Sequence, residues 1–272
     1  MAHPLQKNIG ERESEESVLD LTSLQKRTGK LTLESGDFHV WTASLPTAEE
    51  ALKSYRSLLS PEEISRASKY VFPRDHAHFV ACRGILRELL GFYLAAPGQA
   101  IKILSSSGEK PSLGIGTGSL DIRFNLSHSN GFAVFAFSIG REIGIDTEFI
   151  KAEIAAEEIA TRYFSVAEQQ ELAALEPQDR AVGFFRCWTR KEAYVKARGQ
   201  GLQIPLNSFS VTLSPGAAAR LTSGDANRWS LHSLDVQPGW SSALVVEGNS
   251  ARISVKKYST TGQIVETPAG GQ

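Results

Sequence analysis

The segment Trp188-Thr189-Arg190-Lys191-Glu192-Ala193-Tyr194-Val195-Lys196-Ala197 places an acid and a base one helical turn apart. Successive helical residues are rotated by about 100°, so Glu192 and Lys196 share an arc with apolar side chains. The apolar members of this arc are Phe184, Phe185, Trp188 and Val195. Positions elsewhere around the helix, which we expect to be exposed, hold Arg186, Arg190 and Arg198. A carboxylate buried beside aromatic rings must be paired, hydrogen-bonded or bound to a metal.

The same pair also has an ordinary structural interpretation. A Glu and a Lys four residues apart on an exposed helix face form a common ion pair worth about 0.2–0.5 kcal/mol. The helix pattern alone does not choose between such an ion pair and a functional one. The choice depends on what the rest of the chain brings to this helix.

An internal echo links this helix to an earlier one, 104 to 105 residues before it. Ser60-Pro61-Glu62-Glu63 resembles Ser165-Val166-Ala167-Glu168, and a Pro-x-Asp sequence opens a longer helix at Pro73 and again at Pro177. Further matches along the two long helices are Ala77 with Ala181 and Glu88 with Glu192. Chance matching of common residues is the alternative, but the order of a short capped helix and a long helix repeats as well, which favours duplication.

Short alternating or apolar runs bounded by turn residues predict strands in both halves. They cover residues 38–41, 101–104, 122–126 and 133–137, and then 143–148, 209–213, 229–232 and 242–246. The predicted fold class is therefore α+β, a pseudo-twofold pair of similar lobes, each a long helix packed on a small, mainly antiparallel sheet. The lobes are predicted at residues 36–140 and 141–260, with 1–35 as a disordered arm and 261–272 as a flexible tail.

Composition predicts a globular protein that does not wrap a polyanion. The 272 residues are 41% hydrophobic, and 29 basic against 30 acidic residues leave a formal net charge of -1, which gives no global field to gather nucleic acid. The longest apolar stretch, Gly131–Gly140, is too short to span a membrane. The N-terminus lacks a basic region followed by a hydrophobic one, so we expect a cytoplasmic protein. Cys82 and Cys187 lack metal-ligand spacing and are expected to be free thiols.

Two acidic residues lie two positions apart in a predicted strand. Asp146 and Glu148 should leave the same face of this strand, while Ile143 and Ile145 occupy the other. Neighbouring carboxylates repel each other, and a divalent cation such as Mg²⁺, which prefers oxygen ligands, is the ordinary remedy. The alternative is a solvated strand end that binds no metal.

Polar residues end the preceding strand in the sequence Asn125-Leu126-Ser127-His128-Ser129-Asn130. Adjacent strand residues face opposite ways, so Ser127 and His128 cannot act as nucleophile and base, and the chain has no GxSxG motif. They could instead hold a phosphate, the alternative being a histidine satisfied within a turn. Neither GxxxxGK[ST] nor GxGxxG occurs. Basic residues that could join a phosphate site, or could simply snorkel beside an apolar helix face, are Arg66, Lys69, Arg74, Arg83, Arg87 and the turn residue Lys110.

Taken in order, these segments resemble the 4'-phosphopantetheinyl transferases of the surfactin-synthetase-activating (Sfp) type. The matching pieces are Gly108-Glu109-Lys110-Pro111, Phe124-Asn125-Leu126-Ser127-His128-Ser129, Gly144-Ile145-Asp146-Thr147-Glu148, and Trp188–Ala197 followed by Gly199-Gln200-Gly201-Leu202. Each piece is weak alone, but the ordered set is specific and covers nearly all of the predicted folded part. The resemblance implies the fold of that family, with coenzyme A bound between the lobes. It also implies Mg²⁺-dependent transfer of the 4'-phosphopantetheine arm to a serine of an apo acyl or peptidyl carrier protein, with release of 3',5'-ADP.

The resemblance also implies roles for individual residues. Asp146, Glu148 and Glu192 would bind Mg²⁺ together with the pyrophosphate of coenzyme A. Glu192 would accept the serine proton, and Lys196 would stabilise or protonate the leaving phosphate. No nucleic acid or membrane partner is expected, and the protein is expected to be a monomer. The residues expected to hold coenzyme A are Arg66, Lys69, Arg83, Lys110, Asn125, Ser127 and His128.

Two departures from the family pattern concern the grip on the 3'-phosphate: Glu63 stands where a basic residue is frequent, and Glu109 enlarges a Gly-Lys-Pro turn. Two other functions remain as alternatives. A Mg²⁺-dependent phosphohydrolase of coenzyme A-like pyrophosphates would use the same carboxylates with water as the nucleophile. The other alternative is a carrier-binding protein that has lost activity. The joint presence of Asp146, Glu148, Glu192 and Lys196 argues against it, since loss of activity would be expected to remove at least one of them.

Overall fold

The computed structural model describes residues 18–20, 31–104, 110–114, 120–199, 203–259 and 263–267. Most of the predicted arm and tail lies outside these ranges. The helices are α2 (Glu49–Arg56), α3 (Pro61–Ala67), α4 (Pro73–Leu94), α5 (Ala156–Tyr163), α6 (Val166–Ala173) and α7 (Pro177–Arg198), with short 3₁₀ turns η1 (Gly98–Ala100) and η3 (Leu206–Ser208). The strands are β1 (Val18–Asp20), β2 (Asp37–Ser44), β3 (Ile103–Leu104), β4 (Ser112–Leu113), β5 (Ile122–Ser129), β6 (Phe132–Ile139), β7 (Ile143–Phe149), β8 (Trp229–Ser233), β9 (Trp240–Glu247), β10 (Arg252–Tyr258) and β11 (Gln263–Thr267).

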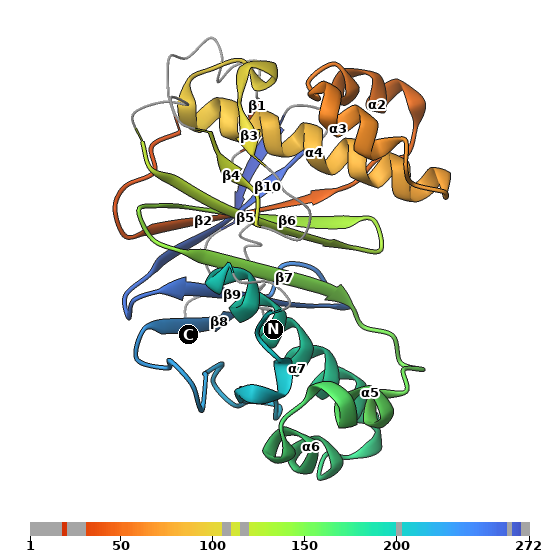
Figure 1. Cartoon of the computed structure of the whole chain (residues 1–272), viewed down its shortest axis with the longest axis vertical. Helices are drawn as coiled ribbons and strands as arrows, with labels where there is room; N and C mark the ends of the chain where they lie inside the picture. The colour runs from red at the N-terminus through yellow and green to blue at the C-terminus, as the bar shows by residue number, and fades with distance from the viewer. Residues whose placement is uncertain are drawn as a thin grey trace, which may run out of the picture.

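The described part of the chain forms four layers (Figure 1). α4 covers one face of a sheet with strand order β1-β11-β10-β2-β6-β5, and α7 covers one face of a second sheet with order β7-β9-β8. The other faces of the two sheets pack together through an apolar layer that includes Phe38, Val134, Ile145 and Leu244. This arrangement of two helix-covered sheets, mainly antiparallel, confirms the predicted α+β fold.

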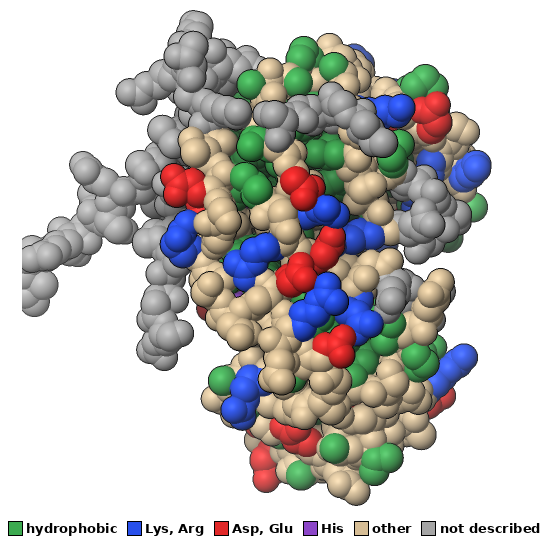
Figure 2. All heavy atoms as spheres, turned by 60° about the vertical axis from the view of Figure 1, so that its left-hand side comes forward, with side chains coloured by type: hydrophobic (Ala, Val, Ile, Leu, Met, Phe, Trp, Pro, Cys, Tyr) green, Lys and Arg blue, Asp and Glu red, His purple; other side chains and the backbone are tan. Residues whose placement is uncertain are grey.

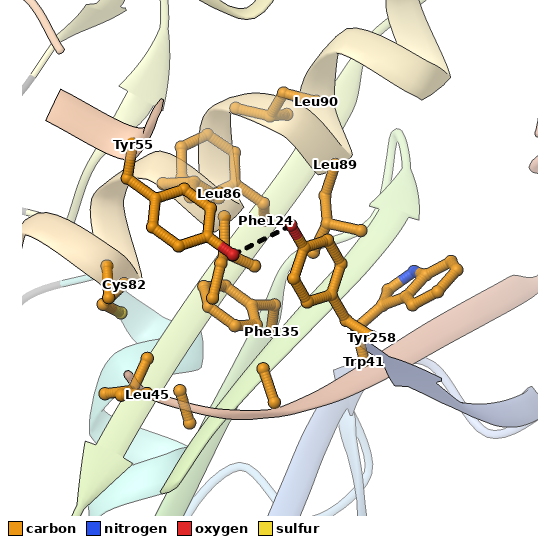
Figure 3. Packing of buried hydrophobic residues seen from close by; sticks show 14 of the residues in the cluster. Trp41, Leu45, Tyr55, Cys82, Leu86, Leu89, Leu90, Phe124, Phe135 and Tyr258 are labelled. Atoms are coloured by element: carbon orange, nitrogen blue, oxygen red, sulfur yellow. Dashed lines mark hydrogen bonds between the residues drawn. The ribbon is translucent and has the colours of Figure 1, made fainter. Parts of the chain in front are cut away.

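The core of the first lobe lies between α4 and its sheet (Figure 3). Leu86 and Leu89 of α4 are fully buried, as is Trp41 of β2. The Tyr55 hydroxyl from α2 lies 3.2 Å from the Tyr258 hydroxyl from β10, so this strand of the sheet is tied to the helical layer. The equivalent core of the second lobe packs between α7 and β7, β8 and β9.

The internal echo appears in the structure as two similar helical units. α4 and α7 each have 22 residues and open with a proline. Each follows a short helix whose N-terminus carries a capping box, Ser60 with Glu63 and Ser165 with Glu168. In such a box the serine hydroxyl and the glutamate carboxylate each accept an otherwise unpaired backbone N–H, which fixes where the helix begins.

The capping glutamates have a second use that also repeats. Glu63 pairs with Arg87 of α4 at 2.7 Å, and Glu168 pairs with Lys191 of α7 at 2.8 Å. The two cations are buried and donate to backbone carbonyls that follow the long helix in the chain: Arg87 to Gly98 and Ile101, Lys191 to Leu206 and Phe209. Each buried charge is therefore paired and hydrogen-bonded, as burial requires.

Three strands depart from the predicted organisation at the ends of the chain. β10 falls within the predicted second lobe, yet it pairs in parallel with β2 of the first. β1 and β11, which lie in the segments predicted as arm and tail, pair with each other, and β11 also pairs with β10. The partners in the β10–β2 and β1–β11 pairs are more than 200 residues apart in the chain, so local sequence patterns carry no signal for these two pairings. The remaining division into lobes stays a prediction.

Two local predictions were wrong. Residues 209–213 form only an isolated bridge, Val211 with Leu221, because Glu168 accepts the Val211 N–H and Glu171 accepts the Ser214 N–H where a strand partner would stand. Arg190, expected on an exposed face of its helix, is buried and donates to Thr212 and Ser233. Cys82 and Cys187 are buried free thiols, as predicted.

Candidate functional site

The site is built where β5, β7 and α7 meet. β5 and β7 belong to different sheets, and β5 side chains join them: the Asn125 carboxamide oxygen accepts the Ile145 N–H at 2.9 Å, and the Ser129 hydroxyl donates to Glu148 at 2.7 Å. The polar residues at the end of β5 therefore serve first as the junction between the lobes. Asn125, predicted to hold coenzyme A, has its carboxamide oxygen committed to this junction.

The alternation of β7 is as predicted. Ile143 and Ile145 lie in the apolar layer between the sheets, while Gly144, Asp146 and Glu148 lie on the face toward α7 and β5. A Cβ on Gly144 would lie 2.1 Å from the Ala193 carbonyl oxygen, so only glycine allows α7 to pack this closely on β7. This contact brings Asp146 within reach of Lys196.

Asp146 is 3% exposed and is the centre of the charged cluster. Its Oδ1 accepts from the Lys196 ammonium at 2.7 Å and from the Ser127 hydroxyl at 2.8 Å. Lys196 Nζ also lies 3.0 Å from Ser127 Oγ. Asp146 Oδ2 is buried and has no hydrogen-bond partner among the described residues. One oxygen of a buried carboxylate is thus satisfied by the protein, and the other is left to be satisfied by a ligand.

Glu148 and Glu192 are half-buried and coupled to Asp146. Burial raises the pKa of Glu192, the Asp146 charge raises it further, and Lys196 opposes both effects. Burial also raises the pKa of Glu148, against the hydrogen bond from Ser129, and Asp146 again raises it. Across the described residues no three His, Cys, Asp or Glu side chains converge closely enough to form a ready metal site. The charge of Asp146 nevertheless affects both Glu148 and Glu192, and the Lys196 ammonium donates a hydrogen bond to Asp146.

A cavity of about 820 Å³ opens beside this cluster, between the two lobes. Glu192 and Lys196 form part of its wall. Of the residues predicted to hold coenzyme A, five line it: Arg66, Arg83, Lys110, Asn125 and His128. Ser127 is buried behind the wall on Asp146, whereas Lys69 is exposed and does not belong to the lining.

The basic residues of the wall differ in how they are held. Arg83 is buried, its Nε lies 3.2 Å from Glu63, and its Nη1 is buried without a hydrogen-bond partner in the described part of the chain. Burial lowers the pKa of Arg83, and the Glu63 charge opposes this. Arg66 lies 5.6 Å from the centre of the Phe79 ring. Glu63, the departure from the family pattern, is therefore a helix cap and the counterion of two buried arginines.

His128 lies at the end of β5 with an exposed side chain in the cavity. The walls displace part of the water around the ring, which lowers its pKa, and the nearby His78 and Lys196 lower it further. The neutral imidazole can donate one N–H to a phosphate oxygen, and a bound phosphate would favour the doubly protonated ring.

Sequence reasoning placed Trp188 on the same helix arc as Glu192 but missed the other residues of an apolar part of the wall. Tyr163 and Trp188 pack edge to face at 5.7 Å between ring centres, and the segment 204–207 lies beside them in the lining. Trp188 precedes Glu192 by one helical turn, and this spacing was the available signal. Arg162 and Tyr163 at the end of α5 carry no comparable signal in the sequence.

The fold and the site together characterise this protein. It consists of two helix-covered sheets, and acidic and basic side chains surround a cavity between the lobes. Two family models match successive parts of the chain, "4'-phosphopantetheinyl transferase, N-terminal" over residues 41–139 and "4'-phosphopantetheinyl transferase superfamily" over residues 142–253. The chain belongs to the 4'-phosphopantetheinyl transferase superfamily. This confirms the family resemblance and the enzyme class drawn from the sequence.

Two sequence relatives agree with this assignment. The 4'-phosphopantetheinyl transferase HetI of Nostoc sp. (strain PCC 7120) is 38% identical over 219 residues, which cover 80% of this chain and 91% of HetI. The transferase Sfp of Bacillus subtilis is 27% identical over 200 residues, 73% of this chain and 87% of Sfp. A solved holo-(acyl-carrier-protein) synthase of Bacillus anthracis, in complex with CoA (3',5'-ADP), aligns with a TM-score of 0.31 at 22% identity, covering 40% of this chain and 96% of that one.

Within the described ranges, none of the helices is both long enough and apolar enough to cross a bilayer.

Proposed function

We propose that this protein transfers the 4'-phosphopantetheine arm of coenzyme A to a serine of an apo acyl or peptidyl carrier protein. The serine Oγ forms a bond to the phosphorus that carries the pantetheine arm, the pyrophosphate P–O bond breaks, and 3',5'-ADP leaves. The observation that supports this proposal most directly is the contact between Lys196 and Asp146 beside Glu192. This contact lies at the wall of a cavity that is also lined by several arginine and lysine side chains. Family membership supplies the reaction type.

Glu192 is the group we assign to the serine proton. It lines the cavity, and the raised pKa of its carboxylate makes it a stronger base than an ordinary glutamate once it is ionised. Lys196 lies one turn further along α7, and its ammonium can stabilise charge that develops on the leaving 3',5'-ADP phosphate. Glu192 and Lys196 would then act at opposite ends of one displacement, Glu192 at the attacking serine and Lys196 at the leaving phosphate.

Mg²⁺ is the metal we assign to the acidic cluster, with Asp146, Glu148 and Glu192 as its holders. The unpartnered Asp146 Oδ2 and the all-oxygen donor set fit a hard cation that keeps water and phosphate ligands. When bound, Mg²⁺ would neutralise charge on the pyrophosphate. Lys196 now occupies Asp146 Oδ1 and satisfies part of the charge that a metal would otherwise meet.

Arg66, Arg83, Lys110 and His128 are the residues we assign to the phosphates and adenine end of coenzyme A, because they line the cavity. Ser127, which is buried and donates a hydrogen bond to Asp146, would act on this ligand only through Asp146. Lys69 is the weakest member of this set, since its side chain is exposed outside the lining. We further propose a cytoplasmic monomer, with neither nucleic acid nor membrane as a partner.

The deciding experiment is the intact mass of several apo carrier proteins after incubation with the protein, coenzyme A and millimolar Mg²⁺. A carrier that gains one phosphopantetheine arm, with 3',5'-ADP released only when carrier is present, supports the transferase. Release of 3',5'-ADP without carrier would instead indicate the phosphohydrolase. Excess EDTA should abolish the mass gain, and wild-type turnover in EDTA would refute the metal assignment.

A further inference from the structure

Lys110 lines the cavity, and its ammonium group is held at a defined point. Its side chain is 14% exposed, and Nζ donates to Glu142 Oε2 at 2.7 Å and to the Ile143 carbonyl at 2.8 Å. An ammonium group has three N–H donors. These two bonds anchor Lys110 to the start of β7 and leave one donor for a ligand in the cavity.

Glu142, which makes the charged contact to Lys110, is itself fixed on several sides. Its second carboxylate oxygen, Oε1, accepts from Arg123 of β5 at 2.9 Å. Its backbone N–H donates to Glu247 Oε2 at 3.1 Å, and its carbonyl accepts the Glu247 N–H at 3.0 Å. Glu142 therefore lies at a junction of β5, β7 and β9. At the level where the two lobes meet, the surface of the molecule carries both acidic and basic side chains (Figure 2).

The charge of Glu142 has a clear effect on Lys110. Burial lowers the pKa of Lys110, Glu142 counters this through its hydrogen bond and its charge, Arg123 lowers it, and Glu247 raises it. A largely buried ammonium beside an arginine needs a carboxylate to remain charged and in place. Removing Glu142 would leave Lys110 with the Ile143 carbonyl and with a neighbouring like charge.

We propose that Glu142 is a positioning residue: it holds the Lys110 ammonium at the cavity wall so that the remaining N–H meets a phosphate of coenzyme A. This inference rests on the proposed function, which assigns Lys110 to that ligand. Glu142 does not touch the ligand itself and acts only through Lys110. The sequence motifs around Lys110 and Asp146 did not include it.

The test is calorimetric titration of coenzyme A into the full chain and three variants: Glu142→Ala, Lys110→Ala and the double variant. We expect Glu142→Ala to weaken binding about tenfold, the loss of one well-placed charged contact. In the Lys110→Ala background the same substitution should have no further effect. In the transfer assay Glu142→Ala should raise KM for coenzyme A and leave kcat nearly unchanged, and Glu142→Asp should restore part of the loss.

The matched control is Asp121→Asn. Asp121 also pairs with Arg123, at 3.0 Å, but makes no hydrogen bond or ion pair to Lys110, so this variant loses one negative charge from the same cluster and should bind coenzyme A as wild type does. Glu142→Gln keeps the shape of the side chain and should fold even where Glu142→Ala does not; it should weaken binding by less than tenfold. Unchanged or tighter binding in the Glu142 variants, or an equal loss in the Lys110→Ala background, would overturn the proposal. Calorimetry needs no carrier protein, so a chain that binds coenzyme A but modifies no carrier refutes the transferase function alone.

Discussion

The two long helices carry a glutamate at the same position, with different surroundings. Glu88 and Glu192 each lie fifteen residues after the proline that opens α4 or α7. Glu88 accepts a hydrogen bond from the Tyr258 hydroxyl at the edge of an apolar core. The Tyr258 hydroxyl is in turn hydrogen-bonded to the Tyr55 hydroxyl. Glu192 faces a cavity and is coupled to Asp146, Glu148 and Lys196.

The difference lies in the partners and not in the helix. Both helices begin alike, both are anchored by a capping glutamate that pairs with a buried cation, and burial raises the pKa of both glutamates. One turn beyond Glu192 the second helix has Lys196, and one turn beyond Glu88 the first has Phe92, which packs against the core. A repeated helical scaffold therefore positions an acid twice, and among the described residues the copy on α7 lies beside further charges, those of Asp146, Glu148 and Lys196.

The largest expected effect comes from the same substitution in the two lobes. Glu192→Gln keeps the side-chain shape but removes the base and a proposed Mg²⁺ oxygen, so we expect the transfer rate to fall by about 10²–10⁴-fold with little change in melting temperature. Glu88→Gln is the matched control and should transfer at the wild-type rate. Carrier mass gain against time measures both. Equal rates in the two variants would show that the second helix is not the catalytic one.

A backbone contact should give the next largest effect. In Gly144→Ala the new Cβ would meet the backbone of Ala193 and Ala197, which cannot move aside without shifting α7. We expect a loss of about 1–3 kcal/mol in the free energy of unfolding, together with reduced activity because Glu192 and Lys196 move with the helix. Gly183→Ala on α7 is the control: its Cβ would meet the flexible end of Leu175, so it should cost less. Denaturant unfolding that ranks the two variants in the opposite order would contradict this account.

Local chemistry determines how much of this molecule the sequence predicts. The capping boxes, the opening prolines and the shared face of Asp146 and Glu148 depend on residues a few positions apart, and these predictions agree with the structure. The burial of Arg190 and the parallel pairing of β10 with β2 depend on partners far away in the chain. For the same reason the motifs located Lys110 but not Glu142, which reaches it from a separate segment 32 residues later.

The smallest expected effect is a difference in pH dependence caused by Glu88. Burial raises the pKa of Glu88 above the ordinary value of 4.5, against the hydrogen bond from Tyr258, so the folded state binds this proton more tightly than the unfolded state does. Stability from this group is then present at low pH and is lost as pH rises from about 4.5 through the folded-state pKa. Glu88→Gln removes this titration and keeps an oxygen that can accept the Tyr258 hydroxyl.

We therefore expect Glu88→Gln to gain stability relative to wild type as the pH is raised above 4.5. Urea unfolding of both proteins at several pH values in this range measures the difference. Tyr258→Phe provides the companion measurement: it removes the hydrogen bond that opposes the shift, so the pH dependence of its stability should be steeper than that of wild type. If the wild-type and Glu88→Gln curves run parallel, Glu88 titrates as it does in the unfolded chain, and the first lobe does not perturb its glutamate as the second lobe does.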